Sequence, residues 1–342
     1  MNMKKFLEKF TNKITLRGLL EKKSNDYTCV EQKFNRNTKQ SLLQLQSFML
    51  PKKWKRIGVS VIIPTFNSNV SLAYTLSHIE YACENETGVD LECIVVDDAS
   101  KEPASERFEY FQKKFDLKFV RNTRNKGAGV SRCRGVDIAK NEILVFLDSD
   151  IIPTQNFFTN HAYLHFILAD EDVILASFRE KVKSNDKRLR IGLLENGKVD
   201  ISNDFRVKIT IQSAWTQNSR YQNCEIKLLK RTKNWKNFGN GKQCAIWTLP
   251  MMGIASTLSC RRSLFKSIDF HPELFRGWGF EDTAMCVALI THGAYLIPNF
   301  NSSALHINHA SRSGSNYKKM QDFLRNKKQY MKFLNSIPLI IK

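Results

Sequence analysis

The chain has 342 residues, 42% of them hydrophobic, which is enough to bury a full core and excludes a disordered chain. This length suits one large α/β domain with extensions, or two small domains. No apolar run of about eighteen residues is present and the N-terminus lacks the features of a secretory signal, so we expect neither a membrane span nor a cleaved leader, and a cytoplasmic location.

The net charge of +20 is concentrated at the two ends of the chain. Residues 1–56 contain fourteen Lys or Arg against four acids, and residues 312–342 contain eight against one, which leaves a net charge of only +3 on residues 57–311. Basic tails on a nearly neutral body favour an anionic membrane surface or an acidic partner over a nucleic-acid groove. The pattern predicts no nucleic-acid partner and favours peripheral contact with the inner membrane face through the basic termini.

The first basic tail has the pattern of an amphipathic helix. Phe6, Leu7, Phe10 and Ile14 recur at helical spacing with lysines between them. This is typical of helices that lie in a membrane interface. The alternative is a helix that docks on the domain and exposes its charges to solvent.

Strands and helices alternate from residue 57 onward. Apolar, β-branched runs predict strands, and a 3.6-residue period predicts the helices between them. The expected strands span 57–63, 91–96, 117–120, 143–147 and 173–176, and the expected helices span 72–79, 130–139 and 157–168. This order predicts a parallel sheet whose ligands bind at the carboxyl ends of the strands.

The remainder of the chain divides into an insertion and three regular segments. Residues 179–250 are polar and rich in Lys and Asn, which predicts an insertion with a few short strands. Regular structure is expected again over 252–259, in a helix near Arg261, and in a helix from Glu281 to His292 that ends at Gly293. A last helix from Tyr317 is expected to pack on the domain through Met320, Phe323, Leu324, Met331 and Leu334.

Polar residues that directly follow the strands are the first candidates for a site. Asp148 and Asp150 follow a buried strand and point to the same side of an extended chain, so both can address one Mg²⁺ or Mn²⁺ ion, or they can cap the next helix. Asp97 and Asp98 can bind a ribose or a base, or can simply form a turn. The segment Arg121 to Gly127 offers cations and a glycine before a helix N-terminus, which suits a diphosphate.

A second group of candidates lies near the C-terminus. Glu281 and Asp282 open a helix, where acids are favoured by the helix dipole alone. The preceding Gly277-Trp278-Gly279 favours a functional interpretation, because glycines let the backbone approach a ligand and tryptophan offers a face for a sugar ring. His306 or His309 can supply a metal ligand.

Taken in order, these motifs resemble those of the GT-A glycosyltransferases of the family 2 type. The resemblance covers about residues 57–310, and the Gly-Trp-Gly-x-Glu-Asp form is similar to a branch that transfers galactose and N-acetylgalactosamine, including bacterial chondroitin-type polymerases. The segments that carry it are Val59 to Asn67, Ile94 to Ser100, Asn125-Lys126-Gly127, Asp148-Ser149-Asp150 and Gly277 to Asp282.

The resemblance implies a GT-A fold, a Rossmann-like sheet with helices on both faces, for a domain over 57–311. Charge and helical spacing outside this domain predict helical extensions at both termini: a basic, partly helical one over 1–56 and a basic helix over 312–342. Within the domain, residues 57–178 would bind a UDP-sugar, 179–250 would form the insertion, and 251–311 would bind a glycan, glycolipid or peptide acceptor.

The same resemblance implies a role for each candidate. Asp282 would be the general base, with Glu281, Trp278 and Gly279 holding the acceptor, and Mn²⁺ or Mg²⁺ would be bound by Asp150, Asp148 and His306, with His309 as the alternative. The nucleotide sugar would lie against Pro64, Thr65, Asn67, Asp97, Asp98, Arg124, Lys126, Arg132 and Asp148.

Two departures from the family pattern and two alternatives remain. Arg132-Cys133-Arg134 replaces the usual Arg-Asn, which leaves open which arginine faces the phosphate, and residues 268–273 differ from the usual acceptor segment. A nucleotidyltransferase on a related scaffold would explain Asp148 and Asp150 but give Trp278 and Asp282 no task. A non-catalytic module recruited to a membrane is the second alternative. For the transferase, we expect an inverting single displacement.

Overall fold

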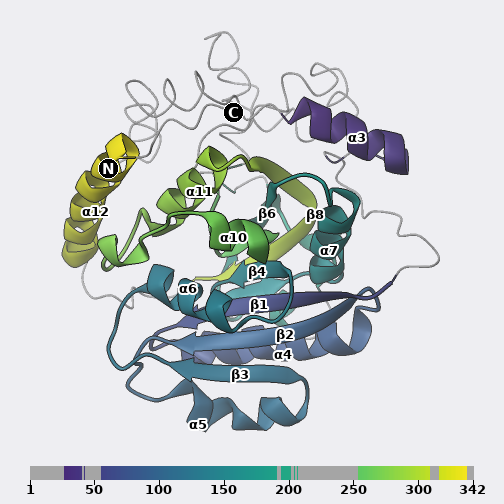
Figure 1. The fold of residues 1–342 in the computed structure, drawn as a ribbon. Coiled ribbons are helices and arrows are strands. Elements are labelled where there is room, and N and C mark those ends of the chain that lie inside the picture. The colour runs from purple at the N-terminus through teal and green to yellow at the C-terminus, as the bar shows by residue number, and fades with distance from the viewer. Residues whose placement is uncertain are drawn as a thin grey trace.

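The computed structural model describes residues 27–40, 42, 55–190, 194–201, 204, 206, 253–308 and 316–336. The predicted helix around 6–14, His309 and most of the 179–250 insertion lie outside the described residues. Within them, one eight-stranded sheet crosses the molecule in the order β3-β2-β1-β4-β7-β6-β8-β5 (Figure 1).

The N-terminal half of the sheet is parallel and forms where the sequence predicts it. Its strands are β1 (Ile57–Thr65), β2 (Val89–Asp97), β3 (Asp116–Arg121) and β4 (Ile143–Leu147), with β1 pairing in parallel with β2 and β4, and β2 with β3. The central strands are buried on both faces, which explains their nearly continuous apolar sequences. The polar residues that follow these strands therefore meet at one edge of the sheet.

The C-terminal half is mixed. It contains β5 (Ile151–Pro153), β6 (Val173–Val182), β7 (Thr257–Arg261) and β8 (Tyr295–Ile307). Strand β7 is antiparallel to both β4 and β6, and β8 is parallel to β6 and antiparallel to β5. The five predicted strands thus run in one direction, as expected, while β7 and β5 make the sheet mixed rather than wholly parallel.

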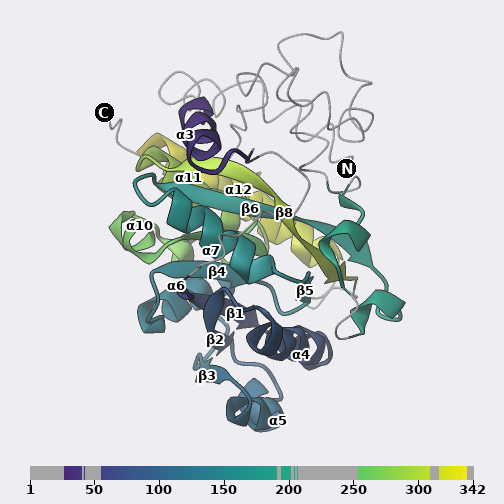
Figure 2. The ribbon, with the colours of Figure 1, turned by 90° about the vertical axis from the view of Figure 1, so that its right-hand side faces the viewer.

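Helices cover both faces of the sheet, as predicted (Figure 2). Successive β1 residues point to opposite faces, so Val61 and Ile63 pack toward α4 (Asn69–Asn85) while Ile62 packs with Val136 of α6 (Ala128–Ile138). The other helices are α3 (Thr28–Thr38), α5 (Ala104–Phe108), α7 (Phe157–Ile167), α10 (Arg262–Ser267), α11 (Glu281–Thr291) and α12 (Asn316–Ser336), with short 3-10 helices at Glu109–Lys113, Lys187–Leu189, Asn196–Lys198 and Pro272–Leu274.

Helix α12 packs on the domain as predicted, with Phe323 and Leu334 against the core, but two of the five predicted residues do not. Met320 and Leu324 are 42% and 51% exposed, so their predicted burial is wrong. The buried side of the helix includes Asp322, Asn326 and Tyr330. The spacing of apolar residues misplaces the centre of the buried face because Asn326 is buried there and donates to carbonyls elsewhere in the domain, while Asp322 pairs with Arg325 of the same helix.

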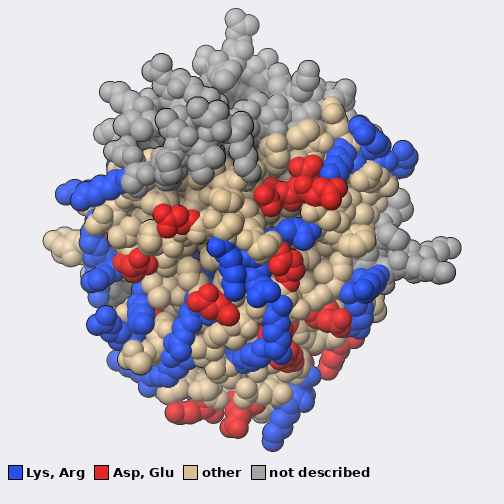
Figure 3. All heavy atoms as spheres, viewed as in Figure 1, with Lys and Arg blue, Asp and Glu red and all other residues tan. Residues whose placement is uncertain are grey.

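The charge on the surface and the length and polarity of the helices concern the predicted relations to nucleic acid and membrane. On the face shown in Figure 3, Lys and Arg side chains are interspersed with Asp and Glu rather than gathered into one basic groove. Among the helices that the structure describes, none is both long and apolar enough to cross a membrane.

Candidate functional site

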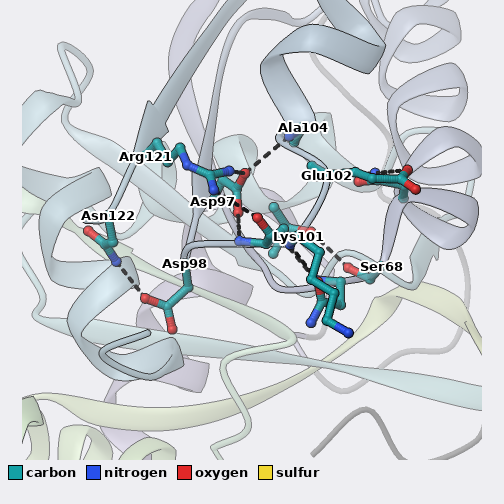
Figure 4. Close-up of polar contacts among 12 residues, drawn as sticks. Ser68, Asp97, Asp98, Lys101, Glu102, Ala104, Arg121 and Asn122 are labelled. Carbon is teal, nitrogen blue, oxygen red and sulfur yellow. Dashed lines mark hydrogen bonds and ion pairs between the residues drawn. The ribbon is translucent and has the colours of Figure 1, made fainter. Parts of the chain in front are cut away.

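Asp97, at the end of β2, organises the loop that follows it. Its carboxylate accepts hydrogen bonds from the backbone amides of Ser100 (2.8 Å) and Ala104 (3.1 Å), and from the guanidinium of Arg121 (2.7 Å) at the end of β3 (Figure 4). The side chain is buried. A carboxylate offers about four acceptor positions, so about one remains for a ligand.

Asp98 holds the segment before α6 in place through its carboxylate. It accepts from the backbone amides of Lys126 and Gly127 (both 2.8 Å) and from the side-chain amide of Asn122 (2.7 Å). Arg124 and Lys126, the cations predicted to face a diphosphate, therefore lie on a segment whose backbone is held by the Asp98 carboxylate. The side chains of Arg124 and Lys126 themselves are exposed.

Asn67 connects the loops after β1 and β2. Its backbone is in the left-handed region with φ of 49°, its amide donates to Ser100 Oγ, and its side-chain oxygen accepts from the amide of Lys101, both at 2.9 Å. Asparagine is one of the few residue types that adopts this backbone readily. Asn67 thus shapes the rim where the nucleotide is predicted to lie.

A chain of hydroxyl groups joins β1 to the acidic motif after β4. Thr65, which follows Pro64 at the end of β1, places Oγ1 2.7 Å from Ser68 Oγ, which in turn lies 2.7 Å from Ser149 Oγ. These groups are buried. The predicted nucleotide residues and the Asp148-Ser149-Asp150 motif are therefore parts of one connected site.

Arg132 links the two predicted halves of the site. This side chain on α6 is buried, and its guanidinium donates to Asp148 Oδ1 at 2.7 Å and to Asp282 Oδ1 at 2.6 Å. Burial lowers the pKa of Arg132, but the charges of Asp282 and Asp148 outweigh burial and raise it. Arg134 instead donates to the carbonyl of Arg121 and to Asn122, so the arginine that faces the acids is Arg132.

A glycine permits the close approach that this link requires. At Gly129, a Cβ would lie 3.1 Å from Pro272 Cβ and 3.4 Å from Glu281 Cβ, tighter than or at the limit of ordinary contact. The first turn of α6 therefore packs against the start of α11, and the nucleotide half and the acceptor half meet there.

Glu281 and Asp282 lie in the first turn of α11 and differ in their surroundings. Asp282 is paired with Arg132, and its Oδ2 accepts from the amide of Ala255 at 3.2 Å. Among the described residues, Glu281 Oε2 has no hydrogen-bond partner. Burial, and then the charge of Asp282, raises the pKa of Glu281 to about 7. Burial also raises the pKa of Asp282, whereas Arg132 opposes that rise.

This contrast separates two roles. Neighbouring carboxyl groups whose surroundings differ are how proteins assign one as a base and the other as a hydrogen-bond donor. Asp282, stabilised as an anion by Arg132, suits the base. Glu281, partly protonated near neutral pH, suits a donor to a sugar hydroxyl.

The structure brings together two of the three predicted metal ligands. Strand β5 pairs with β8 so that Ile151 lies opposite His306, and Asp150 Oδ1 lies 3.6 Å from His306 Nε2. Asp148 is directed at Arg132 instead, and the described residues hold no group of three or more His, Cys, Asp or Glu side chains arranged for a metal. One carboxylate and one imidazole still fit Mn²⁺ or Mg²⁺, which often retain water and take phosphate oxygens as further ligands.

A further cation, which sequence reasoning missed, faces the acids. Arg179 on β6 donates to the hydroxyl of Ser256, next to the amide of Ala255 that binds Asp282. Burial is the main reason that the pKa of Arg179 is lowered, with the charges of Asp148 and Asp150 opposing. The sequence predicts a strand that ends at residue 176 and an insertion that begins at 179, whereas β6 continues to Val182 across an irregularity after Ser177 and so places Arg179 on the sheet.

Trp278 lies in a tightly turned loop beside the acid pair. Gly277, Gly279 and Phe280 have positive φ angles of 74°, 97° and 74°, and Trp278 is 47% exposed. Lys319 Nζ lies 5.7 Å from the centre of the indole ring. An exposed aromatic face thus stands directly before Glu281 and Asp282 in the chain.

Comparison with known proteins identifies a family and several related sequences. The model of glycosyl transferase family 2 matches residues 60–246, more than half of the chain. The chondroitin synthase of Pasteurella multocida is 26% identical over 247 residues, which cover 70% of this chain and 24% of that protein. The chondroitin synthase of Escherichia coli is 26% identical over 253 residues, covering 73% and 34%. The chain thus spans between a quarter and a third of the length of these relatives.

A solved structure shares the fold. Staphylococcus aureus TarS, residues 1–349 in complex with UDP-GlcNAc, superposes with a TM-score of 0.50 at 19% sequence identity, covering 75% of this chain and 60% of TarS. At this identity the likeness concerns the fold alone, and it agrees with the GT-A arrangement of strands and helices.

Proposed function

The chain belongs to glycosyl transferase family 2 and is a glycosyltransferase, and from this premise we propose that it moves a sugar from a UDP-linked donor to an acceptor hydroxyl. The observation that carries the proposal is the position of Arg132, whose guanidinium binds Asp148 on the donor side and Asp282 on the acceptor side. A bound donor and a bound acceptor would therefore meet within reach of one buried cation.

The donor would occupy the edge formed by the ends of β1, β2 and β4. We propose that the base and ribose lie against Pro64, Thr65 and Asn67, where Asp97 and Asp98 retain acceptor capacity. The exposed side chains of Arg124 and Lys126 and the buried Arg132 would lie toward the diphosphate. Support for a UDP-sugar comes from the complex of TarS with UDP-GlcNAc.

A divalent cation, Mn²⁺ or Mg²⁺, would be held by Asp150 and His306, with Asp148 as a further ligand once it turns from Arg132. When bound, such an ion neutralises part of the charge that gathers on a departing diphosphate. The side chains of Arg132 and Arg179 contribute fixed positive charge in the same place, and buried charges of this kind require no reorganisation during reaction.

The transfer step would be an inverting single displacement. The acceptor oxygen forms a bond to the anomeric carbon as the bond from that carbon to the UDP oxygen breaks, Asp282 takes the proton of the acceptor hydroxyl, and UDP leaves with the bonding electrons. A positioned base contributes about 10² to 10⁴-fold to the rate. Glu281, Trp278 and Gly279 would hold the acceptor sugar.

The Gly277 to Asp282 motif favours a galactose, N-acetylgalactosamine, N-acetylglucosamine or glucose donor. The two chondroitin synthases among the relatives support this class of sugar. The acceptor would be a hydroxyl of a glycan, a glycolipid or a peptide.

The proposal is tested by a panel of UDP-, GDP- and dTDP-sugars with and without Mn²⁺, followed by Asp282→Asn. We expect slow hydrolysis of a UDP-sugar to UDP by the wild type, and loss of transfer with retained donor binding in the variant. Transfer by Asp282→Asn at the wild-type rate contradicts the role of Asp282. Pyrophosphate release from a nucleoside triphosphate would indicate a nucleotidyltransferase, and no turnover or binding of any donor would indicate a non-catalytic module.

We also propose that the protein lies at the inner face of a membrane, held through α12. Tyr317, Met320 and Leu324 are 73%, 42% and 51% exposed on one side of this helix, and Lys328 and Lys332 are nearby on the helix surface. Exposed apolar residues flanked by lysines suit an anionic lipid surface. Co-sedimentation should therefore occur with phosphatidylglycerol vesicles and weaken in Leu324→Ser, and failure to bind such vesicles contradicts the proposal.

A further inference from the structure

The C-terminal helix holds the loop that carries Trp278 through one buried side chain. Asn326 of α12 is fully buried, and its side-chain amide nitrogen lies 2.9 Å from the carbonyl oxygen of Arg276, 3.3 Å from that of Trp278 and 2.9 Å from that of Gly279. Three carbonyls of one loop thus share the hydrogens of one amide that lies about fifty residues further along the chain. Among the described contacts, no other side chain donates to so many carbonyls of this loop.

The loop has a conformation that depends on external support. Phe280 adopts a positive φ of 74° although it is not a glycine, a backbone state that most residues avoid. Its ring stacks on Tyr330 with centroids 5.2 Å apart and contacts Phe323 at 5.0 Å, and both partners belong to α12. Helix α12 therefore supports the side chain as well as the carbonyls of this loop.

The loop backbone also lies directly against α12. A Cβ added to Gly277 would lie 2.2 Å from Asp322 Oδ2, so a side chain at this position would collide with the helix. Asp322 is fixed by Arg325 at 2.9 Å, and the guanidinium of Arg325 donates to the Arg276 carbonyl as well. The polar residues on this face of α12 are thus all engaged with the loop or with each other.

The loop leads straight into the proposed catalytic helix. Phe280 is the residue that caps α11, and Glu281 and Asp282 follow as its first two residues. Any shift of the loop would move Trp278 and the acid pair together. The match to the family model ends at residue 246, so α12 and the contacts it makes lie outside the part of the chain that the family model covers.

We propose that α12 is a structural part of the acceptor site and that Asn326 is its positioning residue, a role that rests on the proposed sugar transfer. Asn326 touches no reacting atom. It sets the position of Trp278 and of the start of α11, and so it should affect the use of the acceptor more than the use of the donor.

Asn326→Asp tests this inference, because aspartate keeps the size of the side chain and removes both amide hydrogens. Losing these hydrogen bonds should lower kcat/KM for the acceptor by about tenfold or more. Donor KM should stay within about twofold of wild type, and the slow hydrolysis of the UDP-sugar without acceptor, which does not use Trp278, should fall less than acceptor transfer does. Gln321→Ala, an exposed position on the same helix, is the matched control and should leave both activities unchanged.

Equal losses of donor hydrolysis and acceptor transfer, or an unchanged acceptor kcat/KM, overturn the inference. If Asn326→Asp does not fold, Asn326→Ser replaces it, since serine keeps one donor and should produce a smaller acceptor defect of the same kind. A wild-type protein that neither hydrolyses nor transfers from any nucleotide sugar contradicts the proposed function itself, and that result is distinct from a wild type that transfers but is insensitive to Asn326.

Discussion

Replacing Arg132 by methionine removes the only link that joins Asp148 directly to Asp282 in the described contacts. The guanidinium side chain is 4% exposed and makes two ion pairs, at 2.6 Å and 2.7 Å. Methionine has similar length and fills the space without charge. The change therefore tests electrostatics with little loss of packing.

The direction in which the pKa of Asp282 should change follows from its ion pair with Arg132. Asp282 acts as a base only when it is ionised, and Arg132 favours that form by lowering its pKa against the effect of burial. An opposite charge at such a distance shifts a carboxyl pKa by about 1 to 3 units. Without Arg132, the acidic limb of the pH profile of kcat/KM should move to higher pH by at least about one unit, and activity at a fixed pH below it should fall about tenfold or more.

The assay is the pH dependence of sugar transfer under conditions limited by the acceptor. Arg134→Met is the matched control, since Arg134 lies two residues away and contacts Asn122 and a backbone carbonyl rather than the acids. It should leave the profile in place. An acidic limb that stays where it is in Arg132→Met, while the protein remains folded by thermal melting, refutes the assignment of Arg132 and Asp282 as an electrostatic pair.

Two further predictions concern the metal and the fold. Calorimetry should show weaker UDP-sugar binding after chelation of divalent ions, and His306→Ala should bind the donor equally with and without Mn²⁺; retained Mn²⁺ dependence in that variant contradicts the role of His306. Burial raises the pKa of Glu86 from 4.5 to about 7, so the folded chain binds more protons than the unfolded chain in this window, and the free energy of unfolding should fall as pH rises through it. Glu86→Gln should reduce that slope in urea titrations, and an unchanged slope contradicts the assignment.

The sequence was sufficient for the parallel strands of the sheet because the central ones are buried on both faces. Runs such as Val61 to Ile63 and Val145 to Leu147 have no polar interruption, so their positions could be predicted to within a few residues. The same logic located the polar residues at the carboxyl ends. It could not predict that Asp97 and Asp98 accept most of their hydrogen bonds from loop amides. Those amides belong to residues 100–127 and reach the two carboxylates only after the strands have paired.

Polar residues buried for structural reasons were the main source of error. Hydrophobic spacing places Met320 and Leu324 on the face of α12 that packs on the domain. The structure instead buries Asn326, whose side-chain amide donates to three carbonyls in a distant loop. Such a partner has no signature in local sequence. Arg179 was missed for the same reason, since its contact with Ser256 joins segments separated by the insertion.

The charges gathered at the site give a physical reason to expect a divalent cation. Where the two halves of the site meet, the side chains of Asp148, Asp150, Glu281 and Asp282 lie with two buried arginines, Arg132 and Arg179, so acids outnumber arginines there, while the exposed Arg124 and Lys126 add positive charge only at the rim. Protonation of Glu281, whose pKa is raised to about 7, removes only part of this excess. A donor diphosphate would be repelled by the remaining carboxylates, since buried like charges are costly. A divalent ion held by Asp150 and His306 would offset this excess, which makes donor binding, rather than the fold, the property that should respond to the metal.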